Sequence, residues 1–187
     1  MLRATLLALM IASLTTFEAH GQPTRPSPHV FKSGDCKDDA CARDKWVGFL
    51  KLHGQAELGA GPGVQMRLII LNAEPCRQKS DAVEVRRYQL GASPREEVMV
   101  CGQARARSLS SQRADAFAKE LARPAVGQLN GEFPVYCSFA DEGEPIEIHL
   151  LEIMEGGRYR LIEWDCEAPD ALRSLAGQFE DERAPLP

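Results

Sequence analysis

The chain has 187 residues, with 22 lysines and arginines against 27 aspartates and glutamates, for a formal net charge of −5. This acidic balance argues against a general nucleic-acid binder, because such domains are usually basic. The length suits a single domain that buries its own hydrophobic core once an N-terminal leader is removed.

Residues 1–21 have the layout of a secretory signal peptide. Arg3 supplies a positive start, 6–14 is a short apolar run, and Ala19 and Gly21 are small residues before a cut. The run is shorter than the roughly 20 residues of a membrane-spanning helix. A buried N-terminal helix is the alternative. No later segment is apolar enough for a span. The residue directly after the predicted cut is Gln22 and not a cysteine, so a lipid-anchored form is not indicated. Arginine outnumbers lysine and alanine is frequent, as in proteins from GC-rich bacterial genomes. In a bacterium, the signal peptide predicts export to the periplasm or the medium.

The cysteines all lie after the predicted cut, and their even number in an exported chain favours disulfides. They are Cys36, Cys41, Cys76, Cys101, Cys137 and Cys166. The chain has no C-x-x-C pair and no cysteine–histidine spacing typical of zinc, so we expect no metal, no cofactor and no redox motif. The sequence leaves the pairing open. Cys36 and Cys41 either close a small loop or tie it to the body, and Cys76 could reach Cys101.

The first elements expected after the leader are strands. Residues 22–34 hold three prolines and predict an extended leader. Apolar and polar residues alternate over 50–58 and again over 64–71, which predicts two half-buried strands joined by the glycine-rich turn 59–63. Residues 83–90 predict a further strand.

The second half of the chain alternates between strands and helices. Residues 97–106 predict one strand, and an apolar stripe over 111–122, capped by Ser111, predicts a helix. A β-meander follows, with strands expected at 135–141, 146–154 and 158–166. A last helix begins near residues 169–170, with Leu172, Leu175, Ala176 and Phe179 on its apolar side.

These elements predict one α+β domain over residues 35–180, followed by a frayed tail at 181–187. We expect a mainly antiparallel sheet of about six or seven strands, with two helices packed on it and disulfides as staples. A partly closed barrel is the main alternative. No repeat and no second domain is indicated.

The last predicted hairpin contains the candidate catalytic residues, which are Glu147, His149, Glu163 and Asp165. A carboxylate beside a histidine can set its tautomer and raise its pKa. If Gly156 and Gly157 form the turn, however, His149 lies opposite Trp164 among apolar residues, as an ordinary cross-strand packing pair does. We favour this structural interpretation, because no serine or cysteine nucleophile accompanies the histidine.

Arginines at alternate positions form the second candidate site. Arg105 and Arg107 share one strand face, and Arg158 and Arg160 share another. If these faces adjoin, they would form a groove for a carboxylate, a phosphate or an acidic partner. The alternative is a solvated surface whose arginines pair with nearby glutamates such as Glu84, Glu152 and Glu163.

The leading functional hypothesis is a non-enzymatic exported module that binds another protein or an envelope component. An inhibitor or immunity-type role fits the size, the acidity and the missing catalytic set. One alternative is a cell-wall hydrolase using Glu147, Glu152, Glu163 or Asp165, which requires two carboxylates facing each other across an open cleft. Another is a small-ligand carrier, which requires an empty apolar cavity. The oligomeric state is not indicated.

Overall fold

The computed structural model describes residues 25–32, 36–59, 61, 63–73, 76, 82–133 and 146–180. The predicted signal sequence, the predicted strand 135–141 with Cys137, and the tail 181–187 lie outside these residues. In the described part of the chain, no helix is both long and apolar enough to cross a membrane.

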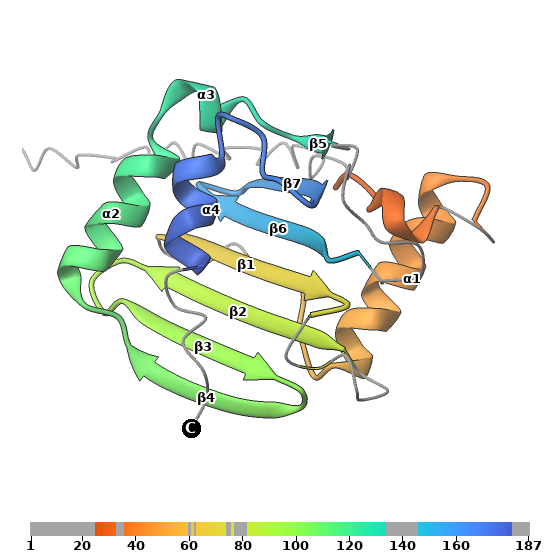
Figure 1. The fold of residues 1–187 in the computed structure, drawn as a ribbon, viewed down its shortest axis with the longest axis horizontal. Coiled ribbons are helices and arrows are strands. Elements are labelled where there is room, and N and C mark those ends of the chain that lie inside the picture. Colours follow the sequence, from red (N-terminus) through yellow and green to blue (C-terminus); the bar gives the residue numbers. More distant parts are fainter. Residues whose placement is uncertain are drawn as a thin grey trace, which may run out of the picture.

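A seven-stranded sheet forms the centre of the fold, in the order β4-β3-β2-β1-β6-β7-β5 (Figure 1). Six strands pair antiparallel, and the short β5 joins β7 in parallel. The strands are β1 (Val64–Leu71), β2 (Val83–Leu90), β3 (Arg95–Val100), β4 (Gln103–Ser108), β5 (Gly131–Phe133), β6 (Ile148–Glu155) and β7 (Arg158–Asp165). The α+β prediction is therefore confirmed. The barrel alternative is wrong, because β4 and β5, the two ends of the strand order among the described residues, do not pair with each other.

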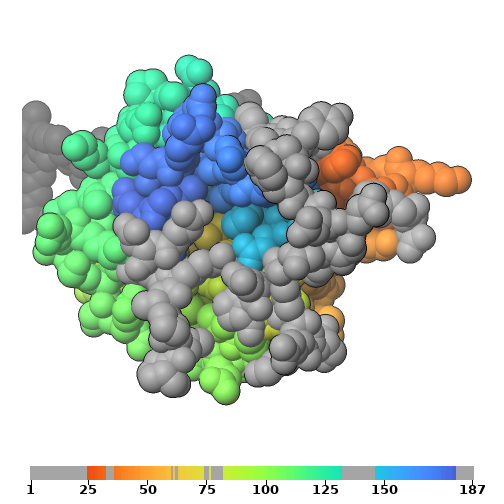
Figure 2. Space-filling view, in the orientation of Figure 1, coloured from red at the N-terminus to blue at the C-terminus, as the bar shows by residue number. Residues whose placement is uncertain are grey.

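One face of the sheet, here called the α2/α4 face, packs against α2 (Ser111–Leu121), α3 (Pro124–Gly127) and α4 (Arg173–Glu180). Even-numbered residues of β1, including Leu68, point to this face and contribute to its core, as do Phe117 and Phe179 of the helices. Figure 2 views this face, with α4 in blue beside α2 in green. The period-two alternation of β1 and the apolar stripes of α2 and α4 are thus confirmed. The cap of α2 is Ser110, whose side chain accepts from the Arg113 amide.

The opposite face, here called the α1 face, is covered by α1 (Asp39–Leu52) and by the short 3-10 helix η1 (His29–Phe31). Trp46 and Leu50 of α1 pack on Ile69 of β1 and on neighbouring strands. In Figure 1 this helix lies at the end of the sheet away from α2. The two faces bury two separate apolar clusters, which gives the sheet a core on each side.

Helix α1 overturns the predicted strand over 50–58. Leu50 is 1% exposed, whereas Leu52 is 81% exposed, so the two do not share a face as a strand requires. In a helix, residues two apart lie on nearly opposite sides. The Asp38 carboxylate caps the start of the helix by accepting a hydrogen bond from the Cys41 amide. This cap was not predicted from the sequence. The prediction of two helices was incomplete, since α1 and α3 were missed.

The predicted strand 97–106 is also wrong, because it is a hairpin that turns at Cys101 and Gly102. Both residues have positive φ, 51° and 79°, as a two-residue type I′ turn requires. Cysteine is not a usual residue for this conformation, so the sequence carried no clear turn signal here. A disulfide between Cys101 and Cys76 ties this turn to the segment that follows β1.

Candidate functional site

The predicted cross-strand register of the last hairpin is confirmed, with His149 opposite Trp164. The two rings stack, with centroids 5.0 Å apart and an interplanar angle of 7°. Nε2 of His149 lies 3.9 Å from Oε2 of Glu147. His149 is thus held against an indole at the end of the sheet, on the α2/α4 face.

The other two candidate carboxylates lie on the opposite face. Strand residues alternate between faces, so Glu163 and Asp165 of β7 point to the α1 face while Trp164 points to the α2/α4 face. Glu163 accepts hydrogen bonds from the backbone amides of His29, at 2.8 Å, and Val30, at 2.9 Å. Its role is to anchor η1 to the sheet. The four candidates therefore do not form one catalytic centre.

Glu152 belongs to a buried ionic cluster on the α1 face. Its carboxylate accepts from Arg67 Nε and, at 2.7 Å, from the Tyr159 hydroxyl. A second Arg67 nitrogen, Nη1, donates to the Ala56 carbonyl. Burial raises the pKa of Tyr159, and the charge of Glu152 raises it further. Both side chains of the ion pair are buried, so Glu152 does not face a second carboxylate across an open cleft, which is the arrangement that the hydrolase alternative requires.

Two of the three glutamates considered from the sequence pair with arginines, but in the interior and not on a solvated surface. Arg67 pairs with Glu152, and Arg86 pairs with Glu84. Burial by itself lowers the pKa of Arg86, but the charge and hydrogen bond of Glu84 outweigh it and leave the pKa raised. Arg67 and Glu152 are directly opposite each other on β1 and β6, so their ion pair joins two strands. Glu84 and Arg86 lie two residues apart on β2, so their ion pair is within one strand.

The two predicted arginine sets do not adjoin. Arg105 and Arg107 lie on β4, and Arg158 and Arg160 lie on β7, with β3, β2, β1 and β6 between them. At about 4.8 Å per strand the separation is about 24 Å. Arg160 is also buried, which lowers its pKa, and it donates to the Val126 carbonyl at 2.6 Å. A single groove lined by both sets therefore does not form.

The sheet is instead open at its β3–β4 end. All six residues of β4 are exposed, and no described strand pairs with the outer edge of β4. Arg105 makes no ion pair with any described residue. Arg107 is held at the surface by Glu96, whose Oε2 lies 2.6 Å from Arg107 Nε, although Glu96 itself is fully buried. We call β3, β4 and the groove beside them the open half of the sheet.

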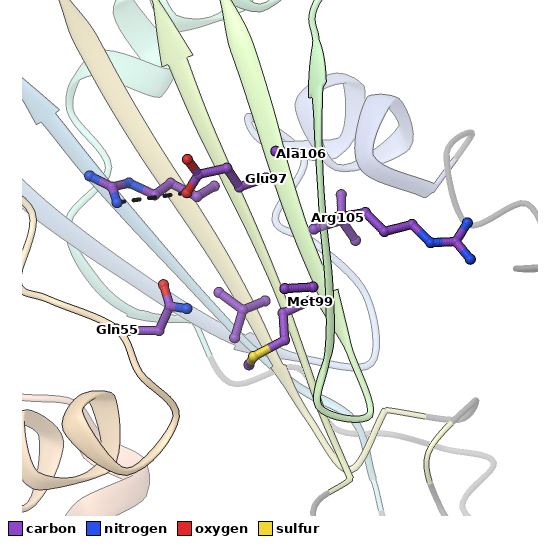
Figure 3. Close-up of a pocket in the computed structure, with 9 residues that line it drawn as sticks. Gln55, Glu97, Met99, Arg105 and Ala106 are labelled. Carbon is purple, nitrogen blue, oxygen red and sulfur yellow. Dashed lines mark ion pairs between the residues drawn. The ribbon is translucent and has the colours of Figure 1, made fainter.

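A groove of about 290 Å³ lies on the α1 face of this open half (Figure 3). Its apolar lining comes from Val85, Met99 and the two alanines of β4, and Gln55, Arg87 and Glu97 supply polar groups. Arg87 Nη1 lies 3.9 Å from Glu97 Oε2. Figure 3 shows Arg105 extending away from these groups. The groove was not predicted from the sequence, because it forms only where the hairpin turn places β3 beside β4.

Two disulfides cross-link the described chain, one near the β3–β4 turn and one at the start of α1. Cys36 pairs with Cys41 at the start of α1, and Cys76 pairs with Cys101 at the β3–β4 turn. Cys166 is also disulfide-bonded. The disulfide prediction is thus confirmed for the described cysteines, including both of the specific pairings considered. Among the described residues no group of His, Cys, Asp and Glu side chains could hold a metal ion.

Comparison with protein-family models, curated proteins and solved structures gives no match for this chain.

Proposed function

We propose that this protein is an exported, non-enzymatic module that binds another protein or an envelope component through the open half of its sheet. The observation that carries the proposal is β4, a fully exposed edge strand with a groove beside it. Unpaired strand edges are sites where proteins readily add a partner segment. Export is supported by the signal-like residues 1–21 and by disulfides, which persist in oxidising compartments.

The geometry favours a macromolecular partner over a small ligand or a substrate. The groove opens onto the sheet surface and merges with the exposed strand, whereas a carrier site encloses most of its ligand. The candidate acids are held in structural contacts, as Glu152 and Glu163 show. An extended protein segment is the partner that can use both the groove and the backbone edge.

The test is selection from a library of random peptides displayed on phage, using oxidised protein purified after export of the full-length chain. Peptides should be recovered, and they should bind the groove-filling variant Ala104→Arg about tenfold or more weakly, because the new side chain crosses the apolar floor. Ala118→Arg is the matched control, since Ala118 is an exposed alanine on α2. Recovery of no peptide, or equal binding to Ala104→Arg, would contradict the proposal.

A further inference from the structure

We infer that β4 accepts an extended segment of a partner protein as an added antiparallel strand, and that this segment has carboxylates at every second position. The inference rests on the proposed function and names the occupant of the open half. Three features of β4 support it: the direction of its backbone N–H and C=O groups, the side chains on each face of the strand, and the charges of those side chains.

The backbone direction follows from the hairpin turn. Val100 and Gln103 flank the two-residue turn, so they form a hydrogen-bonded pair, and such pairs alternate along an antiparallel ladder. The N–H and C=O groups of Gln103, Arg105 and Arg107 therefore point inward to β3. Those of Ala104, Ala106 and Ser108 point outward from the edge. An incoming strand would hydrogen-bond to these three residues.

The charge preference follows from the same alternation. Side chains of Arg105 and Arg107 lie on the α2/α4 face, at positions that would be non-hydrogen-bonded opposite a new strand. Opposing side chains are closest at such positions, with Cα atoms about 4.5 Å apart. Arg105, which has no ion pair among the described residues, would then meet the partner's side chain directly. On this face, β3 and β4 carry two arginines, Arg105 and Arg107, against one glutamate, Glu96, so acidic partner residues are favoured here.

The other face selects apolar partner residues. The side chains of Ala104, Ala106 and Ser108 are small and lie on the α1 face, and both alanines line the groove with Met99. Partner side chains opposite these residues would extend over the alanines towards the apolar floor. The expected segment thus alternates acidic residues, facing the arginines, with apolar residues, facing the groove.

A second copy of this chain is a poor occupant. When two β4 strands pair antiparallel about a two-fold axis normal to the sheet, the same faces coincide, so Arg105 or Arg107 of one copy opposes an arginine or Gln103 of the other. Like charges directly opposite each other destabilise a strand pair. The arginines therefore disfavour self-association at this edge while they favour an acidic strand.

The test uses two blocked synthetic peptides, VEVEVEV and its lysine counterpart VKVKVKV, with binding measured by calorimetry on the oxidised, exported protein. The wild type should bind the glutamate peptide more tightly than the lysine peptide. Arg105→Glu should weaken the glutamate peptide by about tenfold, because it replaces an attraction by a repulsion, and should strengthen the lysine peptide. Ala106→Pro should abolish binding of both, since it removes an outward N–H without disturbing the β3–β4 ladder. Ala118→Arg should change neither.

A readout that needs no variant is hydrogen exchange of the β4 amides. The glutamate peptide should slow exchange at Ala104, Ala106 and Ser108, whose amides point outward, and should leave the Arg105 amide nearly unchanged. Equal affinity for the two peptides, or no protection of the outward amides, would overturn the inference. If phage-selected peptides still require the groove in that case, the proposed function stands and only strand addition at β4 fails.

Discussion

Replacing Arg67 with methionine should remove about 3–5 kcal/mol from the free energy of unfolding, because it leaves a buried carboxylate without its cation. Arg67 is 0% exposed and its partner Glu152 is 1% exposed. In the variant, Glu152 keeps only the hydroxyl of Tyr159 as a hydrogen-bond donor among the contacts described above. The Ala56 carbonyl also loses its bond from Arg67 Nη1. Typical domains have a total stability of about 5–15 kcal/mol, so the loss would be large.

The double variant Arg67→Met with Glu152→Met separates charge burial from packing. Two apolar residues of similar size remove the uncompensated charge, so the double variant should be more stable than Arg67→Met alone, although it has lost one more native side chain. Arg123→Met is a matched surface control. It breaks the ion pair between Arg123 and Glu120, and the Arg123 side chain is 43% exposed. That change should cost no more than about 0.5 kcal/mol.

The assay is urea unfolding at neutral pH with the disulfides intact, followed by tryptophan fluorescence. Trp46 lies on the α1 face and Trp164 on the α2/α4 face, and both are buried, so the emission reports on both layers. The variants should change the midpoint while the denaturant slope stays constant. If Arg67→Met loses less than about 1 kcal/mol, or if the double variant is the least stable of the set, the buried ion pair does not act as described.

Three further changes test other contacts. Burial and the charge of Glu152 raise the pKa of Tyr159 in the folded state. The neutral Tyr159 hydroxyl therefore contributes to folding stability below about pH 10, and that contribution is lost at higher pH, at up to about 1.4 kcal/mol per pH unit. Tyr159→Phe should reduce this dependence of the unfolding free energy on pH; an unchanged dependence would contradict the role of Tyr159. Glu163→Gln leaves one acceptor oxygen for the two η1 amides, so exchange of at least one should accelerate about tenfold by NMR; unaltered exchange would show that the contact is weak. Replacing Cys76 and Cys101 by serine opens a loop of sequence separation 25 and should cost about 3.5 kcal/mol in urea unfolding, whereas a loss under about 1 kcal/mol would show that the staple is dispensable.

Patterns that act within one segment were sufficient to predict much of the fold. The Gly156–Gly157 turn fixed the partner of His149, because a two-residue hairpin sets the register of both strands. The apolar stripes of α2 and α4 were visible because helical residues three and four apart share a face. The same reasoning mispredicted the end of helix α1 as a strand. A short segment with leucines at 50 and 52 fits the alternation of a strand as well as it fits a helix.

The candidate site depended on contacts between distant segments. Arg105 and Arg107 were recognised from the sequence as neighbours on one strand face, and the pairing of Cys76 with Cys101 was considered. The sequence did not show that β1 pairs with β6, which inserts strands between β4 and β7. It also did not show which end of the sheet the helices leave uncovered.

By itself, the sequence determined the α+β class, the antiparallel hairpin of β6 and β7, the alternation of arginines on β4, and the use of cysteines as cross-links. Each of these follows from residues that are neighbours in the chain or from composition. Only the tertiary structure decided that β4 is an edge, that Arg67 and Glu152 meet in the interior, and that a groove forms over Met99. These features arise from strand order and from the placement of helices on the sheet, which are set by the burial of apolar surface between segments far apart in the chain.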